Sequence, residues 1–331
     1  MHDRPRNSRD QILDAVVAIE QRLGRIEQLL VARRQLPLRS KAQAFFVKLG
    51  TFEHYPPRAI RFPPPHVPKV AAADLPSIHI VTPSLNQARF VRETVESVLD
   101  QNYPRLTYVI QDCLSDDGTT EVLEGYKDRL VVRCERDTGQ ANAINRGFED
   151  ADADIMAYLN SDDLLLPDTL AYVAEFFLRN PEIDIVYGHR IVIDAQTFEI
   201  GRWILPSHDS EAIKWADFVP QETMFWRKRV WDRVVELDES FRYALDWDFI
   251  LRAQSLNFKF KRLPRFLGCF RVHDGQKTSS LLDVGVDEMR RLRIRSLGRK
   301  YYARTVRQAI RGYVLEHVLL NLLYRMGILR Y

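Results

Sequence analysis

The chain has 331 residues, of which 46% are hydrophobic and 28% are charged, with a formal net charge of +3. These values are typical of a folded domain with appendages, exclude a disordered or fibrous chain, and give no reason to expect a nucleic-acid partner. No apolar run is long enough to cross a membrane, and the N-terminus lacks the apolar core of a secretory signal, so we expect a cytoplasmic protein. The three cysteines do not have the spacing of a zinc site.

Residues 1–50 are predicted to form an N-terminal helical segment. Apolar residues recur there at spacings of four and three, which places them on one seam of a heptad repeat: Ile12, Val16, Ile19, Leu23, Ile26 and Leu30. So short a seam leaves two interpretations open, a coiled coil that forms a homodimer or docks a partner, and an amphipathic helix packed on its own domain. Residues 51–76 follow as a proline-rich linker or extended strap, since proline neither continues a helix nor donates to a sheet.

From residue 77 the pattern alternates between strands and helices. Strands are predicted over 78–82, 107–111, 130–134 and 154–159, and helices over 88–101, 119–130 and 139–150. Such alternation is typical of an α/β fold with a Rossmann-like, mostly parallel sheet flanked by helices on both faces. Ligands of these sheets bind beyond the carboxyl ends of the strands, and polar residues follow all four predicted strands.

The most suggestive strand end is the acidic doublet Asp162-Asp163. One doublet is weak evidence, because aspartate also caps helices. Four polar strand ends on one rim, however, supply what a nucleotide diphosphate needs, namely oxygen ligands for Mn²⁺ or Mg²⁺ and polar groups for base and ribose. Asp112 suits the base edge, and Asp162 suits the ribose hydroxyls or the metal. No GxxxxGK[ST] or GxGxxG motif follows a strand, which disfavours a kinase-like NTPase and a nicotinamide dehydrogenase.

Five blocks in this order make the segment 77–280 similar to glycosyltransferase family 2, which has the GT-A fold. We place the corresponding domain at residues 77–282. The blocks are Val81-Thr82-Pro83-Ser84-Leu85-Asn86, then Ile110-Gln111-Asp112 with Ser115-Asp116-Asp117-Gly118-Thr119, then Asp137-Thr138-Gly139-Gln140 with Asn145-Arg146-Gly147, then Leu159-Asn160-Ser161-Asp162-Asp163, and Leu245-Asp246-Trp247-Asp248.

The resemblance implies a metal-dependent, inverting transfer of a sugar from a UDP-, GDP- or dTDP-linked donor to a hydroxyl of a glycan or lipid-linked acceptor, in cell-surface polysaccharide synthesis. Asp246 would be the general base. Asp163 would bind the metal directly, Asp162 would share ribose and metal, and the metal would stabilise the departing diphosphate. His273 would also reach the metal, and Arg271 and Lys277 the diphosphate. The remaining residues assigned to the nucleotide sugar are Thr82, Pro83, Ser84, Asn86, Asp112, Gly139, Gln140, Asn160 and Ser161.

Several of these side chains have a second interpretation. Asp246 could be the N-cap of a helix predicted over 247–255, in addition to serving as the base. Trp247 could stack on a sugar ring or lie in the core. Asp248 could be a structural carboxylate or a substitute base on the sugar side. Gln221 and Glu222 are candidates for contacts with hydroxyls of the donor sugar or acceptor.

The C-terminal segment 283–331 is predicted to be a basic amphipathic helical tail. Between Arg290 and Tyr331 there are eleven lysines and arginines but one acid, Glu316. The tail could lie on an anionic membrane surface, making the protein peripheral at the inner face of the cell membrane, or could pack on the domain. A non-catalytic scaffold or sugar-nucleotide-binding protein, organised by the coiled coil, is the alternative function. A nucleotidyltransferase is disfavoured, because it would need a glycine-rich basic loop near the first strand and the sequence has none there.

Overall fold

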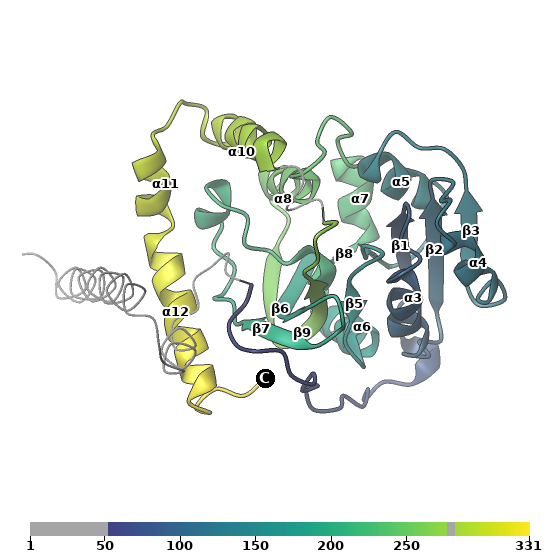
Figure 1. The fold of residues 1–331 in the computed structure, drawn as a ribbon. Helices are drawn as coiled ribbons and strands as arrows, with labels where there is room; N and C mark the ends of the chain where they lie inside the picture. The colour runs from purple at the N-terminus through teal and green to yellow at the C-terminus, as the bar shows by residue number, and fades with distance from the viewer. Residues whose placement is uncertain (1–51, 277–281) are drawn as a thin grey trace, which may run out of the picture. The chain divides into compact units, whose positions relative to one another are not determined.

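A computed structural model of the protein describes residues 52–276 and 282–331, and its strands form one sheet. The predicted coiled coil and Lys277 lie outside these ranges. The strand order is β3-β2-β1-β4-β8-β6-β9-β5, with β7 paired to β6 (Figure 1). The strands are β1 (Ile78–Ser84), β2 (Leu106–Asp112), β3 (Val131–Cys134), β4 (Ile155–Tyr158), β5 (Leu164–Leu165), β6 (Ile185–Ile193), β7 (Glu199–Trp203), β8 (Phe225–Arg227) and β9 (Phe260–Arg271).

The two halves of the sheet differ in strand direction. β3, β2, β1 and β4 are all parallel, as the alternating sequence pattern predicts. The other half is mixed, because β8 runs antiparallel to both of its neighbours, β7 antiparallel to β6 and β5 antiparallel to β9, while β6 and β9 are parallel. A short connection such as 194–198 between β6 and β7 can only join antiparallel strands. The sheet as a whole is therefore mixed rather than mostly parallel.

Helices cover both faces of the parallel half. Successive residues of a strand point to opposite faces, so Tyr108 and Ile110 enter one apolar cluster and Val109 enters another. The first cluster includes residues of α3 (Val91–Leu99), α4 (Thr119–Glu124) and α6 (Thr169–Arg179). The second includes residues of α5 (Gln140–Gly147), α7 (Lys228–Val234) and α8 (Leu245–Ser255). Gly147 ends α5 against β1, where an added Cβ would lie 2.4 Å from Val81 Cγ1.

The proline-rich segment is a strap that packs on the domain. His54 N donates to Ile200 O, and Arg58 forms a bridge with the buried Glu199 on β7. The Glu199 carboxylate also accepts hydrogen bonds from Tyr55, Arg61 N and Arg202. Burial acts to raise the pKa of Glu199, but these partners, Arg202 foremost, lower it to about 2. The strap is thus fixed by an ionised buried carboxylate.

The C-terminal helices are α10 (Leu282–Leu297), α11 (Ala303–Ala309) and α12 (Arg311–Arg325). Along α12, Tyr313, His317 and Asn321 are buried. The Tyr313 ring stacks on Phe218 with centroids 4.0 Å apart, and the Asn321 amide exchanges hydrogen bonds with the backbone of Ile204. α12 therefore packs on the domain through the face that carries Tyr313, His317 and Asn321. Within the described residues, no helix is both long and apolar enough to span a bilayer.

Candidate active site

A cavity of about 780 Å³ lies beyond the carboxyl ends of β1 and β4. It brings together most of the side chains that the sequence singles out: Pro83, Ser84, Gly139, Gln140, Asn160, Ser161, Asp162, Asp163, Gln221, Glu222, Asp246 and Trp247. The remaining predicted residues within the described chain do not line this cavity: Thr82, Asn86, Asp112, Asp248, Arg271 and His273. The rim predicted from the strand ends therefore exists, and its members divide into cavity-lining and supporting groups.

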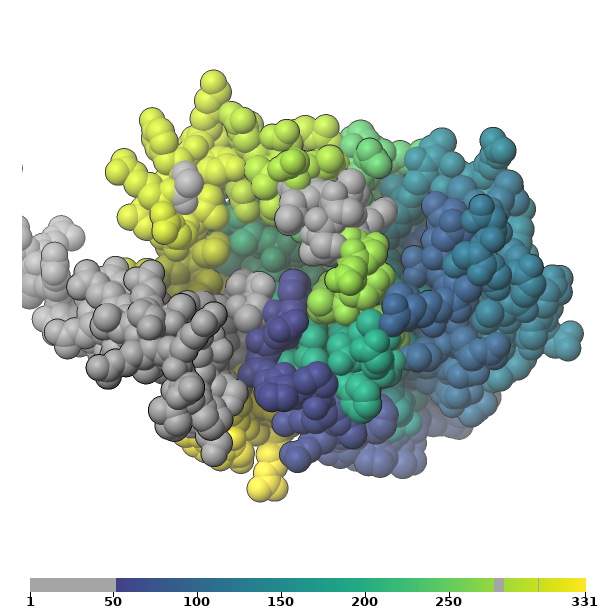
Figure 2. Space-filling model, in the orientation of Figure 1, coloured from purple at the N-terminus to yellow at the C-terminus, as the bar shows by residue number. Residues whose placement is uncertain are grey.

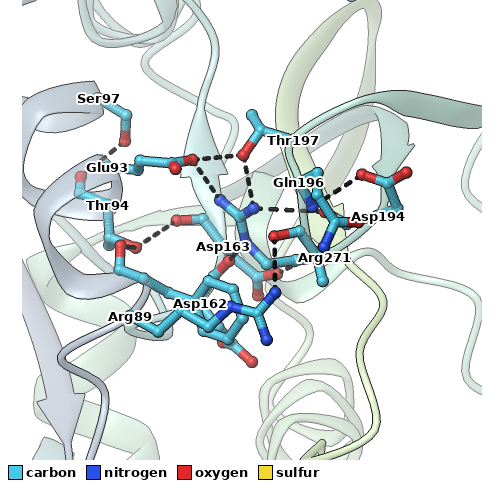
Figure 3. Close-up of polar contacts among 12 residues, drawn as sticks. Arg89, Glu93, Thr94, Ser97, Asp162, Asp163, Asp194, Gln196, Thr197 and Arg271 are labelled. Carbon is cyan, nitrogen blue, oxygen red and sulfur yellow. Dashed lines mark hydrogen bonds and ion pairs between the residues drawn. The ribbon is translucent and has the colours of Figure 1, made fainter. Parts of the chain in front are cut away.

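Arg271 on β9 holds the acidic doublet from the side that faces away from the cavity (Figure 3). Arg271 is 0% exposed, and its backbone N–H donates to Asp163 Oδ1 at 3.0 Å while Nε donates to the carbonyl of Asp162 at 2.7 Å. Its remaining nitrogens bind Thr197 Oγ1 and Glu93 Oε2, and its plane covers the Phe90 ring. The expectation that Arg271 contacts a diphosphate is wrong for this geometry, because its donors are engaged and it does not face the cavity.

The two carboxylates of the doublet differ sharply in environment. Asp163 is 1% exposed, and its oxygens accept hydrogen bonds from Arg271 N and, at 3.2 Å, from Asn160 Nδ2. Burial, followed by the nearby charges of Asp162 and Glu222, raises the pKa of Asp163 well above its ordinary value. Asp162 is more open, with its side chain 19% exposed. Asp162 is therefore the more accessible of the two carboxylates, whereas Asp163, which also lines the cavity, is the more deeply buried. The sequence-based prediction instead makes Asp163 the direct metal ligand.

Asp162 pairs with His273, which follows β9. His273 Nε2 lies 3.0 Å from Asp162 Oδ2, and the imidazole ring also packs on Phe90. This separation is that of a hydrogen bond between the two groups, and it is also about the spacing of two neighbouring ligands of an octahedral cation. No group of three or more His, Cys, Asp or Glu side chains that could hold an ion occurs in the described parts of the chain. A cation at Asp162 and His273 would therefore need further oxygen ligands from its substrate or from water.

Asn160 connects the doublet to two other elements of the cavity. Its Oδ1 accepts a hydrogen bond of 2.6 Å from Gln140 at the start of α5, and its Nδ2 donates to Gln221 Oε1 at 3.1 Å. Gln221 in turn donates to the carbonyl of Tyr158 at 2.7 Å. This amide network fixes the wall between β4 and the 3₁₀ turn η3 (Gln221–Thr223), so these polar groups are positioned before any ligand binds.

Asp112, the predicted base contact, is closed off. It is 0% exposed, and both of its oxygens accept hydrogen bonds from Ser115, from N at 2.8 Å and from Oγ at 2.7 Å. Asn86 completes this turn by accepting from Asp116 N, while Thr82 is buried against the Tyr108 hydroxyl. These three predicted contacts shape the loop beside the cavity, and the adjacent Cys113 lines it instead. A base that reached Asp112 would have to displace Ser115.

Asp246 lies in the first turn of α8, which begins at Leu245, so the N-cap interpretation is wrong because Ala244 occupies that position. Its Oδ1 accepts a hydrogen bond of 2.8 Å from Trp247 N. Burial raises the pKa of Asp246 to about 6. A carboxylate with this pKa is ionised at neutral pH and is a stronger base than an ordinary aspartate.

Asp217 is an acidic residue of this cavity that the sequence analysis missed. It follows the 3₁₀ turn η2 (Ala212–Lys214) and lines the cavity together with Asp246. Burial, followed by the charge of Asp246, raises the pKa of Asp217 well above its ordinary value. Two carboxyl groups that repel in this way disfavour the state in which both are ionised. No motif marks Asp217, since the loop containing it has no recognisable pattern.

Two residues next to Asp246 are structural. Trp247 is 0% exposed and its indole N–H donates to Ile213 O at 2.7 Å, which favours the core interpretation over sugar stacking. Asp248 is also 0% exposed and pairs with Arg252 on α8 and Arg295 on α10. The expectation that Asp248 contacts a sugar or substitutes as the base is therefore wrong, because both of its oxygens are bound by arginines away from the cavity.

The loop before α8 is fixed by Glu288 of α10, another residue that the sequence analysis missed. Its carboxylate accepts three backbone hydrogen bonds, from Arg242 N at 2.8 Å and from Tyr243 N and Ala244 N at 2.9 Å. These donors immediately precede the helix that carries Asp246. Glu288 is thus a positioning residue for the start of α8.

Glu222 lines the cavity but is committed to an ion pair. Its carboxylate binds Arg190 of β6, whose Nε lies 2.8 Å from Oε1. The Arg190 guanidinium is held between the rings of Trp203 and Phe270, 5.0 Å and 4.6 Å from their centroids. Arg190, which the sequence analysis also missed, places one fixed positive charge among the acidic groups of the cavity. Glu222 can accept a substrate hydroxyl only through a lone pair that Arg190 leaves open.

Comparisons with known proteins relate this chain to glycosyltransferases. The family described as "Glycosyl transferase family 2" matches residues 79–234. The putative teichuronic acid biosynthesis glycosyltransferase TuaG of Bacillus subtilis is 37% identical over 107 residues, 31% of this chain and 42% of that protein. A PGL/p-HBAD biosynthesis glycosyltransferase of Mycobacterium bovis is 26% identical over 54% of this chain and 70% of its own length.

Two solved structures share the fold. TarS of S. aureus in complex with UDP-GlcNAc superposes with a TM-score of 0.56 at 19% identity, covering 73% of this chain and 72% of that one. The mannosyltransferase PcManGT of Pyrobaculum calidifontis, in complex with GDP-Man and Mn²⁺, has a TM-score of 0.54 at 16% identity and 80% coverage of both chains. At these identities the likeness concerns the fold. With the ordered motifs at the strand ends, the family match over β1 to α7 makes this part of the chain similar to glycosyltransferase family 2.

Proposed function

We propose that this protein is an inverting glycosyltransferase that moves a sugar from a nucleotide diphosphate to a hydroxyl of a glycan or lipid-linked acceptor. The observation that carries the proposal is a single cavity lined both by Asp162, at the strand end where a metal-bound diphosphate would lie, and by Asp246, a carboxylate with a pKa of about 6. A transfer without a covalent intermediate needs one base and one leaving-group site, and the cavity offers both.

Asp246 would accept the proton of the acceptor hydroxyl as that oxygen attacks the anomeric carbon. The bond from that carbon to the diphosphate breaks in the same displacement, so the configuration inverts and the nucleotide diphosphate leaves. Asp217, whose pKa burial and the charge of Asp246 raise well above its ordinary value, would donate a hydrogen bond to a sugar hydroxyl rather than act as the base. Glu288 keeps the start of α8, and hence Asp246, in place.

Asp162 and His273 would hold the divalent cation, Mn²⁺ or Mg²⁺, and Arg271 and Asn160 keep the doublet in position for it. The cation, when bound, neutralises the charge that develops on the diphosphate. The two solved structures of similar fold are complexes with UDP-GlcNAc and with GDP-Man and Mn²⁺, which supports a nucleotide sugar and a metal as ligands of this chain. Relatives named for teichuronic acid and PGL/p-HBAD biosynthesis support a cell-surface polymer or glycolipid as acceptor.

A panel of UDP-, GDP- and dTDP-sugars tests the proposal. Release of the nucleotide is measured with Mn²⁺ present for the parent protein, for Asp246→Asn and Asp162→Ala, and for the exposed control Asp100→Asn. We expect turnover by the parent and the control, loss of turnover in both cavity variants, and loss of metal dependence of binding in Asp162→Ala alone. Equal turnover by the parent and Asp246→Asn would contradict the assignment of the base. Tight binding of a nucleotide sugar by a parent that never turns it over would indicate the non-catalytic alternative.

A further inference from the structure

A second cavity, here called the C-terminal groove, lies between α10 and α11. Its volume is about 740 Å³, and it is lined by four cations, Arg290, Arg293, Lys300 and Arg307, and by the rings of Tyr301 and Tyr302. No acidic residue of the described chain lines it. The groove therefore concentrates positive charge in a concave space next to aromatic surface.

Most of this charge is uncompensated. Arg290, Lys300 and Arg307 are exposed and form no ion pair with any residue that the structure describes. By contrast, the neighbouring Arg295 is paired with the buried Asp248. Figure 2 shows long side chains projecting from the yellow-green and yellow C-terminal segment. Like charges held close together repel, so an anion that bridges them would be favoured.

Arg293 connects the C-terminal groove to the catalytic cavity, because it lines both. Its Nε donates to Trp215 O at 2.6 Å, and its guanidinium lies over the rings of Trp247 and Tyr301. These contacts hold the planar group at the boundary between the two spaces. Because Trp247 directly follows the proposed base Asp246, a ligand that extended from the base past Arg293 would enter the C-terminal groove.

We propose that the C-terminal groove binds a phosphate group of the acceptor, as a phosphodiester or a diphosphate, while the acceptor hydroxyl lies at Asp246. This inference rests on the proposed function and specifies the class of its acceptor. Arginine is suited to phosphate because its planar fork can donate two parallel hydrogen bonds, and the tyrosine rings can cover the sugar or alkyl part of the same molecule. The concave shape and the shared Arg293 favour a discrete substrate group over the flat surface of a membrane.

The test uses the full chain with UDP and Mn²⁺ at saturation, so that the nucleotide site is filled before a second anion is added. The probes are a short glycerol phosphate oligomer, inorganic phosphate, a neutral oligosaccharide of matched length, and vesicles of phosphatidylglycerol and phosphatidylcholine. The variant Arg290→Gln/Arg307→Gln removes two groove cations, and the control Lys261→Gln/Arg330→Gln removes the same charge from exposed residues outside the groove.

We expect the parent to bind the phosphate oligomer and not the neutral one, and the groove variant to bind it at least about tenfold more weakly, with UDP affinity unchanged. Competition by inorganic phosphate would identify the phosphate group as the bound part. Equal weakening in the control, or no binding of either phosphate probe by the parent, would overturn the proposal. A variant that loses only vesicle binding would also overturn it, in favour of a membrane surface. A parent that binds the oligomer but transfers no sugar would contradict the proposed function while supporting the phosphate site.

Discussion

Replacing Arg271 by lysine tests how the acidic doublet is held. The side chain is fully buried and joins the Asp162 carbonyl, Thr197 and Glu93, while its backbone N–H reaches Asp163 (Figure 3). Lysine keeps the charge and the backbone contact, but its single ammonium cannot occupy the position of Nε and both terminal nitrogens. The variant should therefore retain its fold and lose part of the support of the doublet.

The size of the effect follows from which partners lose a donor. The pair with Glu93 contributes little, because the Glu93 side chain is 45% exposed and Thr197 also donates to it. The Asp162 carbonyl depends on Arg271, whereas the Asp194 carbonyl also accepts a hydrogen bond from Thr197 N. A buried acceptor left without a donor costs about 1–3 kcal/mol, so we expect Arg271→Lys to lower the free energy of unfolding by about 1–3 kcal/mol.

Urea unfolding without nucleotide, followed by Mn²⁺ titration of the UDP complex, measures both consequences. Arg89→Lys is the matched control, since Arg89 is exposed in the same region, and should change the unfolding free energy by less than about 0.5 kcal/mol. Arg271→Lys should unfold at lower urea and need more Mn²⁺. If it instead unfolded like the parent without ligand and lost only its affinity for UDP, Arg271 would be a diphosphate ligand and the structural role would be refuted.

Three further predictions concern the residues around the cavity. Asp246→Asn should lower kcat by about 10²–10⁴-fold. Asp217→Asn should stay active, and its kcat/KM should fall below about pH 6, because Asp246 is then protonated and cannot accept a proton. Loss of activity in Asp217→Asn would instead assign the role of base to Asp217. Glu288→Ala leaves three backbone donors without an acceptor, so it should lower the free energy of unfolding by about 3 kcal/mol. It should also reduce kcat more than it raises KM, and Glu288→Gln should have an intermediate effect. An unchanged kcat would contradict the positioning role. Gly139 has φ +138°, a backbone conformation that strains any residue with a Cβ, although no atom lies within 4 Å of an added Cβ. Gly139→Ala should therefore lower the free energy of unfolding by about 1–3 kcal/mol, measured by thermal unfolding. An unchanged melting temperature would mean that the turn relaxes.

The parallel half of the fold could be predicted from the sequence because a helix connects each of its strands to the next strand of that half along the chain. Apolar runs such as Ile78–Ser84 and Ile155–Tyr158 are buried, and the polar residues after them meet at one rim. The mixed half could not be predicted in the same way. The pairing of β6 with β9 joins residues such as Ile185 and Phe260, which are 75 positions apart in the chain, so it is a tertiary property that no local pattern records.

The site was predictable in its location but not in its division of roles. Asp162 and Asp163 are equivalent in the sequence, and only the fold shows that Arg271 N and Asn160 occupy Asp163 while His273 faces Asp162. Asp112 has the chemistry of a base contact but is satisfied three residues later by Ser115. A motif specifies which side chains approach a cavity, whereas their burial and partners decide what each can do.

Asp217 and Glu288 show what a motif search leaves out. Both act through loops without a recognisable pattern, and each matters because of a distant neighbour, Asp246 for the first and the backbone before α8 for the second. The same holds for the basic tail, whose composition suggests an anionic partner. Its packing separates α12, buried against Phe218 and Ile204, from the cations of the C-terminal groove.

A crystal structure with Mn²⁺ and a non-hydrolysable analogue of the preferred nucleotide sugar tests the central claim most directly, because anomalous scattering locates the metal without assumptions about the protein. The account predicts manganese bound to Asp162 and His273, with the anomeric carbon of the sugar facing Asp246 in the same cavity. Manganese bound elsewhere, or a donor sugar that turns away from Asp246, would contradict it.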